Sequence, residues 1–250
     1  MQNERFIELL VDLHKGLARL GPGSTESTLK ALALCESLPD APVILDLGCG
    51  SGAQTLVLAG ATQGRIVATD LIPDFISELK KKIVEKGLTE QVGLKLADMH
   101  ALPFADSSFD LIWSEGAIYI MGFDTGLQKL RPLLKPAGYL VVSEVAWFRP
   151  DPPTELKNFW RENYPGIRSV EANLEAAKAG GWTLVGNFHL PVTAWTKSYY
   201  APLLERLPAF RSNNIEDADA QTVADMTEYE VSLLERFHEF YGYEFFILRR

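Results

Sequence analysis

Cysteine is scarce in this sequence, which holds only Cys35 and Cys49 among its 250 residues. We therefore expect no framework of disulfide bonds, and so few cysteines are typical of a reducing compartment. Histidine is scarce as well, and none of the 4 histidines stands at metal-ligand spacing from another histidine or from a cysteine. The sequence therefore predicts no metal site.

Long apolar runs and basic stretches are also missing. The N-terminal stretch carries Glu4, Glu8 and Asp12 among its apolar residues, so we expect neither a signal peptide nor a membrane span. Acidic residues outnumber basic ones by 33 to 24, and the formal net charge of −9 makes nucleic acid and anionic membranes poor partners. The one basic cluster, Lys80 to Lys82, is interpreted as a solvated helix face. We expect a cytoplasmic monomer or homodimer.

What the sequence does contain is a regular alternation of short apolar segments with amphipathic ones. Apolar, β-branched strands are typical of a sheet buried on both faces, and their alternation with helices predicts a doubly wound, mainly parallel α/β sheet. The predicted strands are 42–48, 65–70, 92–98, 109–115, 138–147, 182–190 and 243–250. The predicted helices between them are 52–61, 73–87, 125–134 and 169–181.

Two helical regions accompany this core. Leucines at helical spacing predict an amphipathic helix over about residues 4–20, the sequence GPGS breaks it, and Ser24 or Thr25 is expected to cap a second helix. Most of the segment 191–241 also has helical patterning. We expect one domain over 1–250, made of an N-terminal helical cap (1–38), a cofactor-binding core (40–150) and this helical insert.

The insert opens with the aromatic residues Trp195, Tyr199 and Tyr200. A connection of this length needs its own structure or a function. The three rings are interpreted as an aromatic lid over a substrate, as an oligomer contact or as core, and the sequence does not choose among them.

The stretch VILDLGCGSGAQT raises the question of a ligand. An apolar run ends at Asp46, and Gly48, Gly50 and Gly52 follow. Such a turn between strand and helix brings backbone N–H groups close to a ligand at the positive end of the helix dipole. GCGSGA also satisfies the dinucleotide pattern G-x-G-x-x-A, but a carboxylate two residues before Gly48 would repel a pyrophosphate and attract an ammonium. Gly52 would leave room for a bulky ligand moiety.

Asp46 and the three glycines match D-x-G-x-G-x-G, and here the sequence resembles the class I S-adenosylmethionine-dependent methyltransferases. The resemblance covers about residues 40–150 and is closest to small-molecule methyltransferases of the ubiquinone and sterol type. It implies a Rossmann-like fold of seven strands whose sheet ends in an antiparallel hairpin, with 182–190 and 243–250 as its strands. It also implies S-adenosyl-L-methionine as the cofactor. Ala137 stands where the family usually has glycine.

The resemblance implies a set of cofactor-binding residues. In the family, an acid at the place of Asp70 binds the ribose, and an acid at the place of Asp98 binds the adenine together with the next N–H. The set comprises Asp46, Gly48, Cys49, Gly50, Gly52, Asp70, Leu71, Asp98, Met99 and Ser114. From their place before the second helix, we also expect Gly23 and Ser24 to offer N–H donors to the methionine carboxylate. Helix capping is the structural alternative for Asp70, and close packing is the alternative for Cys49.

Three residues are candidates for catalysis. Glu115 leaves the fourth predicted strand, where it is expected to accept a proton, to stabilise a cationic substrate or to cap the turn at Gly116. Tyr119 is expected near the same strand ends and either shapes the substrate pocket or packs, as do Glu144 and Trp147. His14 is a base if its helix covers the cofactor, and otherwise a surface histidine.

The expected activity is in-line transfer of a methyl group to a small-molecule acceptor, for which the protein aligns the reactants and excludes water. An NAD(P)-dependent oxidoreductase that uses Gly48, Gly50 and Asp70 is one alternative. A non-catalytic nucleoside-binding protein of the same fold is another. Methylation of DNA amino groups is disfavoured because WSEGA stands where an NPPY-like tetrad is needed, and two cysteines are too few for arsenic methylation.

Overall fold

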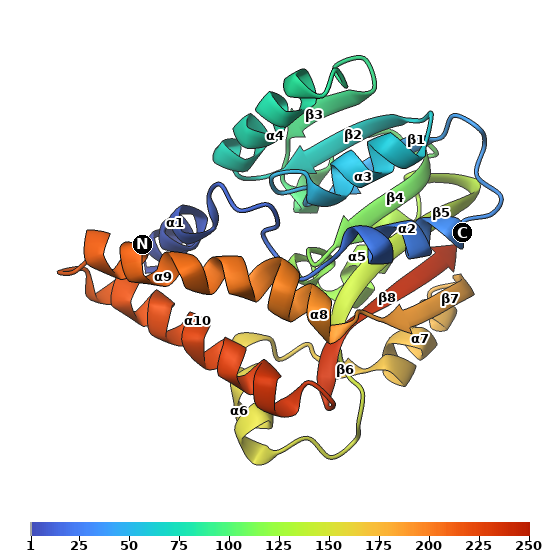
Figure 1. Cartoon of the computed structure of the whole chain (residues 1–250). Helices are drawn as coiled ribbons and strands as arrows, with labels where there is room; N and C mark the ends of the chain where they lie inside the picture. The colour runs from blue at the N-terminus through green and yellow to red at the C-terminus, as the bar shows by residue number, and fades with distance from the viewer. Residues whose placement is uncertain (1) are drawn as a thin grey trace.

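The computed structural model describes residues 2–250, which build one eight-stranded sheet with helices on both faces (Figure 1). The order of the strands is β3-β2-β1-β4-β5-β8-β7, and the short β6 pairs with β5. The strands are β1 (Val43–Leu47), β2 (Arg65–Asp70), β3 (Val92–Leu96), β4 (Phe109–Glu115), β5 (Leu134–Trp147), β6 (Arg168–Ser169), β7 (Thr183–His189) and β8 (Tyr241–Arg249).

The helices connect these strands and add two further groups. The α-helices are α1 (Gln2–His14), α2 (Thr25–Ala33), α3 (Ala53–Ala61), α4 (Pro73–Glu85), α5 (Phe123–Leu130), α6 (Thr154–Asn163), α7 (Val170–Ala179), α8 (Val192–Trp195), α9 (Ala201–Asn213) and α10 (Ala218–Phe237). Single turns are η1 (Met99–Ala101) and η2 (Ile118–Ile120), and η3 (Thr196–Tyr200) is a π-helical turn. Within residues 2–250, no helix is both long and apolar enough to cross a bilayer.

The sheet confirms the expected fold class. Strands β1 to β5 pair in parallel, whereas β8 runs antiparallel to both β5 and β7. The sheet therefore ends in the antiparallel hairpin that the sequence predicted. Two predicted strands, 65–70 and 109–115, coincide with β2 and β4. The pairing of β6 with β5 and the helix α6 were not predicted.

Apolar residues bury the sheet on both faces. On one face, Leu58 of α3 and Leu79 of α4 belong to the same buried cluster as Ile44 of β1. On the other face, Leu127 of α5 packs in a second cluster with Leu45, the next residue of β1. Because adjacent strand residues point to opposite faces, this division is the two-layer cover of a doubly wound sheet.

The N-terminal helix is shorter than predicted, since α1 ends at His14 instead of continuing to about residue 20. Gly16 adopts φ +80°, a left-handed conformation that turns the chain out of the helix. Helix α1 packs against the insert, where Arg5 forms an ion pair with Asp217 at the start of α10 (2.5 Å). In Figure 1, α1, α9 and α10 lie together on the side toward which the parallel strands point. The insert thus stands beside the carboxyl ends of those strands.

Ala137 occupies the predicted glycine position at the start of β5. Its φ of +62° lies in the left-handed region, which costs a residue with a Cβ about 1–2 kcal/mol. The alanine therefore adopts a turn conformation that glycine would adopt without this cost.

Candidate functional site

The glycine loop joins β1 to α3 at the carboxyl edge of the sheet. Gly48, Gly50 and Gly52 all have positive φ, at +71°, +51° and +89°. The N–H groups of Gly48 and Cys49 both donate to the carbonyl oxygen of Thr69 on β2, each at 2.9 Å. These bonds fix the loop against the neighbouring strand. The left-handed conformation of the loop is one that glycine, which has no side chain, adopts readily.

Packing within the protein explains two of the glycines. A Cβ on Gly52 would lie 2.1 Å from Cδ1 of Leu79 in α4. We had expected Gly52 to leave room for a ligand moiety, but it makes room for this helix. A Cβ on Gly50 would lie 2.9 Å from Cδ1 of Leu20, in the segment between α1 and α2. The hydroxyl of Ser51 also donates to the carbonyl of Leu17 (3.4 Å). The N-terminal segment therefore crosses directly over the loop.

We predict that Gly52→Ala lowers the free energy of unfolding by about 2 kcal/mol, because the new Cβ meets Leu79 and the backbone is left-handed. Gly60→Ala is the matched control in the same helix, since nothing lies within 4 Å of its added Cβ. Chemical denaturation of both variants measures the difference. Equal stability of the two variants would contradict the steric explanation.

Asp46 is the last acidic residue before the loop, and it is fully buried. Its carboxylate accepts hydrogen bonds from Thr55 Oγ1 (2.5 Å) and Gln54 Nε2 (3.1 Å), both in α3. Burial raises the pKa of Asp46 to about 7, with smaller contributions from the charges of Glu115 and Asp70. Asp46 thus ties the start of α3 to β1, and its carboxylate is directed at these side chains.

Asp70 ends β2 and faces the glycine loop. Its Oδ2 accepts the N–H of Gly50 (2.8 Å), and its Oδ1 accepts the N–H of Ile72 (2.9 Å). Burial raises the pKa of Asp70, while these backbone donors act in the opposite direction. The next residue, Leu71, is 60% exposed, which is unusual for a leucine at the end of a buried strand. An oriented carboxylate and an uncovered apolar side chain therefore stand next to each other.

Asp98 follows β3 at the same edge. Its Oδ1 accepts the N–H of His100 (2.8 Å) and contacts Nδ1 of that residue (3.0 Å), so Asp98 caps the turn η1. These contacts lower the pKa of Asp98. Met99 packs beside the loop, with its Cε 3.6 Å from a Cβ placed on Gly48. Asp70, Leu71, Asp98 and Met99 together line one continuous edge.

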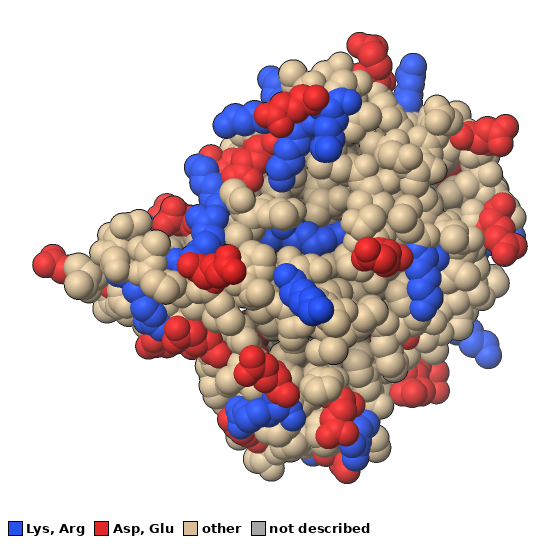
Figure 2. Space-filling view, viewed as in Figure 1, with Lys and Arg blue, Asp and Glu red and all other residues tan. Residues whose placement is uncertain are grey.

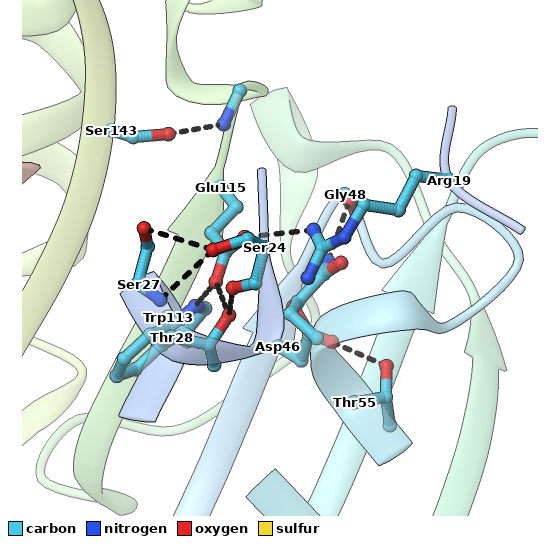
Figure 3. Close-up of polar contacts among 12 residues, drawn as sticks. Arg19, Ser24, Ser27, Thr28, Asp46, Gly48, Thr55, Trp113, Glu115 and Ser143 are labelled. Atoms are coloured by element: carbon cyan, nitrogen blue, oxygen red, sulfur yellow. Dashed lines mark hydrogen bonds and ion pairs between the residues drawn. The ribbon is translucent and has the colours of Figure 1, made fainter. Parts of the chain in front are cut away.

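Glu115, at the end of β4, is enclosed by donors (Figure 3). Its Oε1 accepts from Thr28 Oγ1 of α2 (2.6 Å) and from Trp113 Nε1 (3.0 Å). Its Oε2 accepts from Arg19 Nη1 (3.2 Å), and the two side chains of this ion pair are 3% and 11% exposed. Glu115 therefore fastens the N-terminal segment to the sheet, and both of its oxygens accept hydrogen bonds from the protein itself.

Arg19 was not among the predicted site residues. Its guanidinium lies between Glu115 and the glycine loop in Figure 3, and a Cβ on Gly23 would fall 2.3 Å from its Nη1. The one sign of it in the sequence is a single arginine just before the GPGS turn. Nothing in its local pattern distinguishes it from a surface arginine, because its partner Glu115 is distant in the chain.

Gly23 and Ser24 lie beside this ion pair. The N–H of Gly23 donates to the carbonyl of Ala194 in α8 (3.3 Å). Ser24 is the N-cap of α2, as predicted, and its Oγ accepts the N–H of Ser27 (3.1 Å). The Gly23 N–H thus already donates a hydrogen bond to the insert. The charged donor beside Gly23 is Arg19.

Two predicted residues have side chains away from this edge. Ser114 is fully buried, and its Oγ has no hydrogen-bond partner within residues 2–250. It follows Trp113, the register partner of Asp46, so its side chain points to the opposite face of the sheet. Cys49 is buried as well, and burial raises the pKa of its thiol. Both side chains are thus enclosed by the fold.

His14 and Tyr119 occupy different surroundings. Nδ1 of His14 contacts the carbonyl of Leu10 (2.7 Å), so this nitrogen carries the proton, and Nε2 then accepts from the Tyr199 hydroxyl (2.8 Å). Burial lowers the pKa of His14, which favours this neutral form. The histidine is half-buried and joins α1 to the insert. Tyr119 of η2 is 42% exposed, beside the carboxyl end of β4.

The aromatic opening of the insert is largely core. Trp195 and Tyr200 are 3% and 2% exposed, and Tyr199 is half-buried. Trp195 stacks on Tyr243 of β8 with ring centroids 4.9 Å apart. These rings therefore anchor the insert to the last strand.

Two further kinds of site were considered, a metal site within residues 2–250 and a basic binding surface on the face shown in Figure 2. Residues 2–250 contain no group of three or more His, Cys, Asp or Glu side chains that could hold a metal ion. On the face shown in Figure 2, lysine and arginine side chains are interleaved with acidic ones and form no continuous basic band. Lys82 reaches from α4 to the carbonyl of Ser51 (2.8 Å), so it supports the loop.

Comparison with known proteins agrees with this geometry. Residues 44–138 match the family model described as "Methyltransferase domain". Over 153 residues the chain is 32% identical to the uncharacterized methyltransferase YodH of Bacillus subtilis, covering 61% of this chain and 63% of that protein. The chain spans less than two thirds of the length of the curated relatives that it matches.

Solved structures share the fold over nearly the whole chain. An S-adenosylmethionine-dependent methyltransferase from Geobacter sulfurreducens, in complex with S-adenosyl-L-homocysteine, superimposes with a TM-score of 0.82 at 20% identity and covers 98% of both chains. The cyclase SpnF superimposes with a TM-score of 0.76 at 20% identity, over 100% of this chain and 94% of that one. Proteins of this fold thus include one whose name describes a different reaction.

Proposed function

We propose that this chain, whose residues 44–138 match the family model of a methyltransferase domain, transfers a methyl group from S-adenosyl-L-methionine to a small-molecule acceptor. The observation that carries the proposal is the bond from the Gly50 N–H to Asp70 Oδ2 (2.8 Å). It fixes a carboxylate at the end of β2, beside the exposed side chain of Leu71. A carboxylate next to an apolar surface suits a nucleoside, whose ribose donates hydroxyl groups and whose base needs apolar contact.

The remaining residues of the edge fit the other parts of this cofactor. Asp98 keeps Oδ2 for the adenine amino group, because its contacts with His100 use Oδ1. Leu71 and Met99 supply apolar contact for the base. Arg19 supplies a charged donor for the methionine carboxylate, since guanidinium groups bind carboxylates through paired N–H donors. The backbone of Gly48 to Gly50 lines the path between these two ends.

When bound, S-adenosyl-L-methionine supplies a methyl group that its sulfonium has already activated. The protein then has to hold the donor at the carboxyl edge of β1 and β4, position the acceptor beside it and keep water out. Glu115 fastens the N-terminal segment over the site through Arg19 and Thr28. Its role in this proposal is therefore to position other groups and not to remove a proton.

A dinucleotide is the less suitable ligand for this loop. Leu20 lies over Gly50, and the Leu17 carbonyl accepts from Ser51, so the N-terminal segment takes the place where a pyrophosphate would meet the start of α3. The buried Asp46 carboxylate is not what excludes it, because that group points at α3.

Titration calorimetry with S-adenosylhomocysteine and NAD tests the proposal. We expect the first to bind and the second not to bind. Asp70→Asn should weaken S-adenosylhomocysteine by about 10- to 100-fold, since hydrogen bonds to a charged group contribute about 1.5–3 kcal/mol. Asp74→Asn is the matched control, because Asp74 is exposed in the first turn of α4 and pairs with Lys15 (3.3 Å). Binding of NAD alone would reject the methyltransferase assignment.

We further propose that residues 1–250 act as one domain of a cytoplasmic protein that is a monomer or a homodimer. One buried cluster supports the single domain, since it contains Leu13 of α1, Leu58 of α3, Leu234 of α10 and Ile247 of β8. The two cysteines are free and buried, as expected in a reducing compartment. The acidic net charge of −9 supports a small-molecule acceptor over a nucleic acid.

A further inference from the structure

Glu144 is a buried carboxylate that the proposed cofactor site does not use. It follows Ser143, the register partner of Glu115, so it lies at the same carboxyl edge, with its side chain on the opposite face of the sheet from that of Glu115. It is 1% exposed, and within residues 2–250 neither of its oxygens accepts a hydrogen bond. The hydroxyl of Tyr164 is close enough to lower the pKa of this carboxyl, although no hydrogen bond between the two groups meets the usual distance and angle limits. A buried carboxylate without partners is costly to ionise, and burial raises the pKa of Glu144 to about 7, so a cation beside it would stabilise its charged form.

Three tyrosine rings lie around this part of the edge. The ring of Tyr119 meets that of Tyr164 edge-on, with centroids 5.9 Å apart. Tyr243 lies over the end of β4, because a Cβ on Gly116 would be 3.4 Å from its hydroxyl oxygen. The charge of Glu144 acts on both Tyr119 and Tyr243, where it adds to the effect of burial in raising the pKa of each. Although its surroundings desolvate the hydroxyl group, Tyr119 as a whole is 42% exposed, so a ligand can reach part of its ring.

The titratable side chains around these rings are predominantly acidic. Glu230 of α10 accepts from the Tyr200 hydroxyl (2.6 Å), and its charge also acts on Tyr119 and Tyr243. Asp70 acts on Tyr119 as well. Electron-rich ring faces in a negative field attract cations and repel carboxylates.

Positive charge near Glu144 comes from Arg168. That guanidinium is already committed, since it pairs with Asp124 and its Nε donates to Asn173 (2.6 Å). His14 contributes no positive charge, because burial lowers its pKa and its Nε2 accepts from Tyr199. Arg168 is therefore shared among Glu144, Asp124 and Asn173 and does not balance the Glu144 carboxylate alone.

We infer that the methyl acceptor is a cationic amine, bound against the rings of Tyr119 and Tyr243 in the field of two carboxylates. The inference rests on the proposed function, which places the donor at the adjacent end of β4. The amine first releases its proton to water. Its nitrogen lone pair then forms the bond to the methyl carbon, the bond from that carbon to sulfur breaks, and the electron pair stays on sulfur. The positive charge is thereby transferred to the nitrogen, where the rings and carboxylates stabilise it.

Choline and its neutral carbon isostere, dimethylbutanol, provide the test, because they differ in the charge of one atom. Both are titrated by calorimetry into protein saturated with S-adenosylhomocysteine. We expect choline to bind about tenfold more tightly, the value of a well-placed cation on aromatic rings. Tyr119→Phe should keep this preference, whereas Tyr119→Leu and Glu144→Gln should each remove most of it.

Tyr229→Leu is the matched control, because Tyr229 of α10 is 43% exposed, close to the 42% of Tyr119, and binds Glu155. It should leave the preference unchanged. Binding of S-adenosylhomocysteine without a preference for choline overturns the amine acceptor and leaves the proposed function intact. A preference that survives both Tyr119→Leu and Glu144→Gln overturns the assignment of these residues. Failure to bind S-adenosylhomocysteine rejects the proposed function itself.

Discussion

Replacing Arg19 by alanine is expected to lower the free energy of unfolding by about 3–4 kcal/mol, because it leaves a buried carboxylate without its cation. Glu115 is 3% exposed and keeps Thr28 and Trp113 as donors, but neither of them carries a charge. Chemical denaturation measures the loss. A surface ion pair would change stability by about 1 kcal/mol or less, so the size of the effect tests the burial of this pair.

Arg19→Ala should also weaken S-adenosylhomocysteine by about 10- to 100-fold, if the guanidinium binds the carboxylate of the amino-acid part. Methylthioadenosine lacks that part and should bind the variant as tightly as it binds the original protein. Calorimetry with the two ligands therefore separates a lost contact from a general collapse of the site.

The double variant Arg19→Met, Glu115→Gln separates structure from binding. With both charges removed, the free energy of unfolding should recover to within about 1 kcal/mol of the original protein, since replacing a whole buried pair is often neutral. The affinity for S-adenosylhomocysteine should stay low. If affinity recovers together with stability, Arg19 acts only by holding the N-terminal segment in place.

The parts of the fold that could be predicted are those fixed by neighbours in the chain. The strands 65–70 and 109–115 were found because runs of apolar and β-branched residues mark buried strands directly. Ser24 was identified as a cap for the same reason, since its Oγ bonds to the N–H of Ser27, three residues away. The N-terminal helix was predicted too long because leucines at 17 and 20 continue its spacing, although Gly16 turns the chain.

The interactions of the candidate site residues could not be predicted from the sequence. Asp46 and Gly52 were identified by their motif, and the sequence suggested that both contact a ligand. In the fold, Thr55 donates a hydrogen bond to Asp46, and Leu79 packs against Gly52. Such partners come from other elements, and only the packing of those elements determines them. The pair of Arg19 and Glu115 spans 96 residues of chain, so no local pattern contains it.

The burial of Glu144 also depends on the packing of several elements, and its effect on the pH dependence of stability can be measured. Burial raises the pKa of its carboxyl to about 7 from an ordinary 4.5. In the unfolded chain the group ionises near its ordinary value, while in the folded protein it holds its proton until the higher one. The folded state therefore loses stability relative to the unfolded state as pH rises from about 4.5 to about 7, and the loss is constant above that.

Glu144→Gln removes the charge and keeps the shape, so the variant should be more stable than the original protein by about 3 kcal/mol at about pH 8. The difference should shrink as the pH falls and vanish near pH 4, where Glu144 is mostly protonated in both the folded and the unfolded state. Denaturation across this range measures the change, and Glu175→Gln on the exposed surface of α7 is the control for the same substitution at a solvent-exposed position. A flat difference for Glu144→Gln would mean that the carboxylate has a partner in solution.

The same measurement bears on the acceptor. A cation bound at the rings of Tyr119 and Tyr243 stabilises the ionised form of Glu144, so it lowers the pKa of that group. Saturating choline should therefore reduce the stability gap between the original protein and Glu144→Gln at about pH 8, whereas dimethylbutanol should leave it unchanged. If both ligands leave the gap unchanged, the buried charge is not coupled to the acceptor, and Glu144 serves the fold alone.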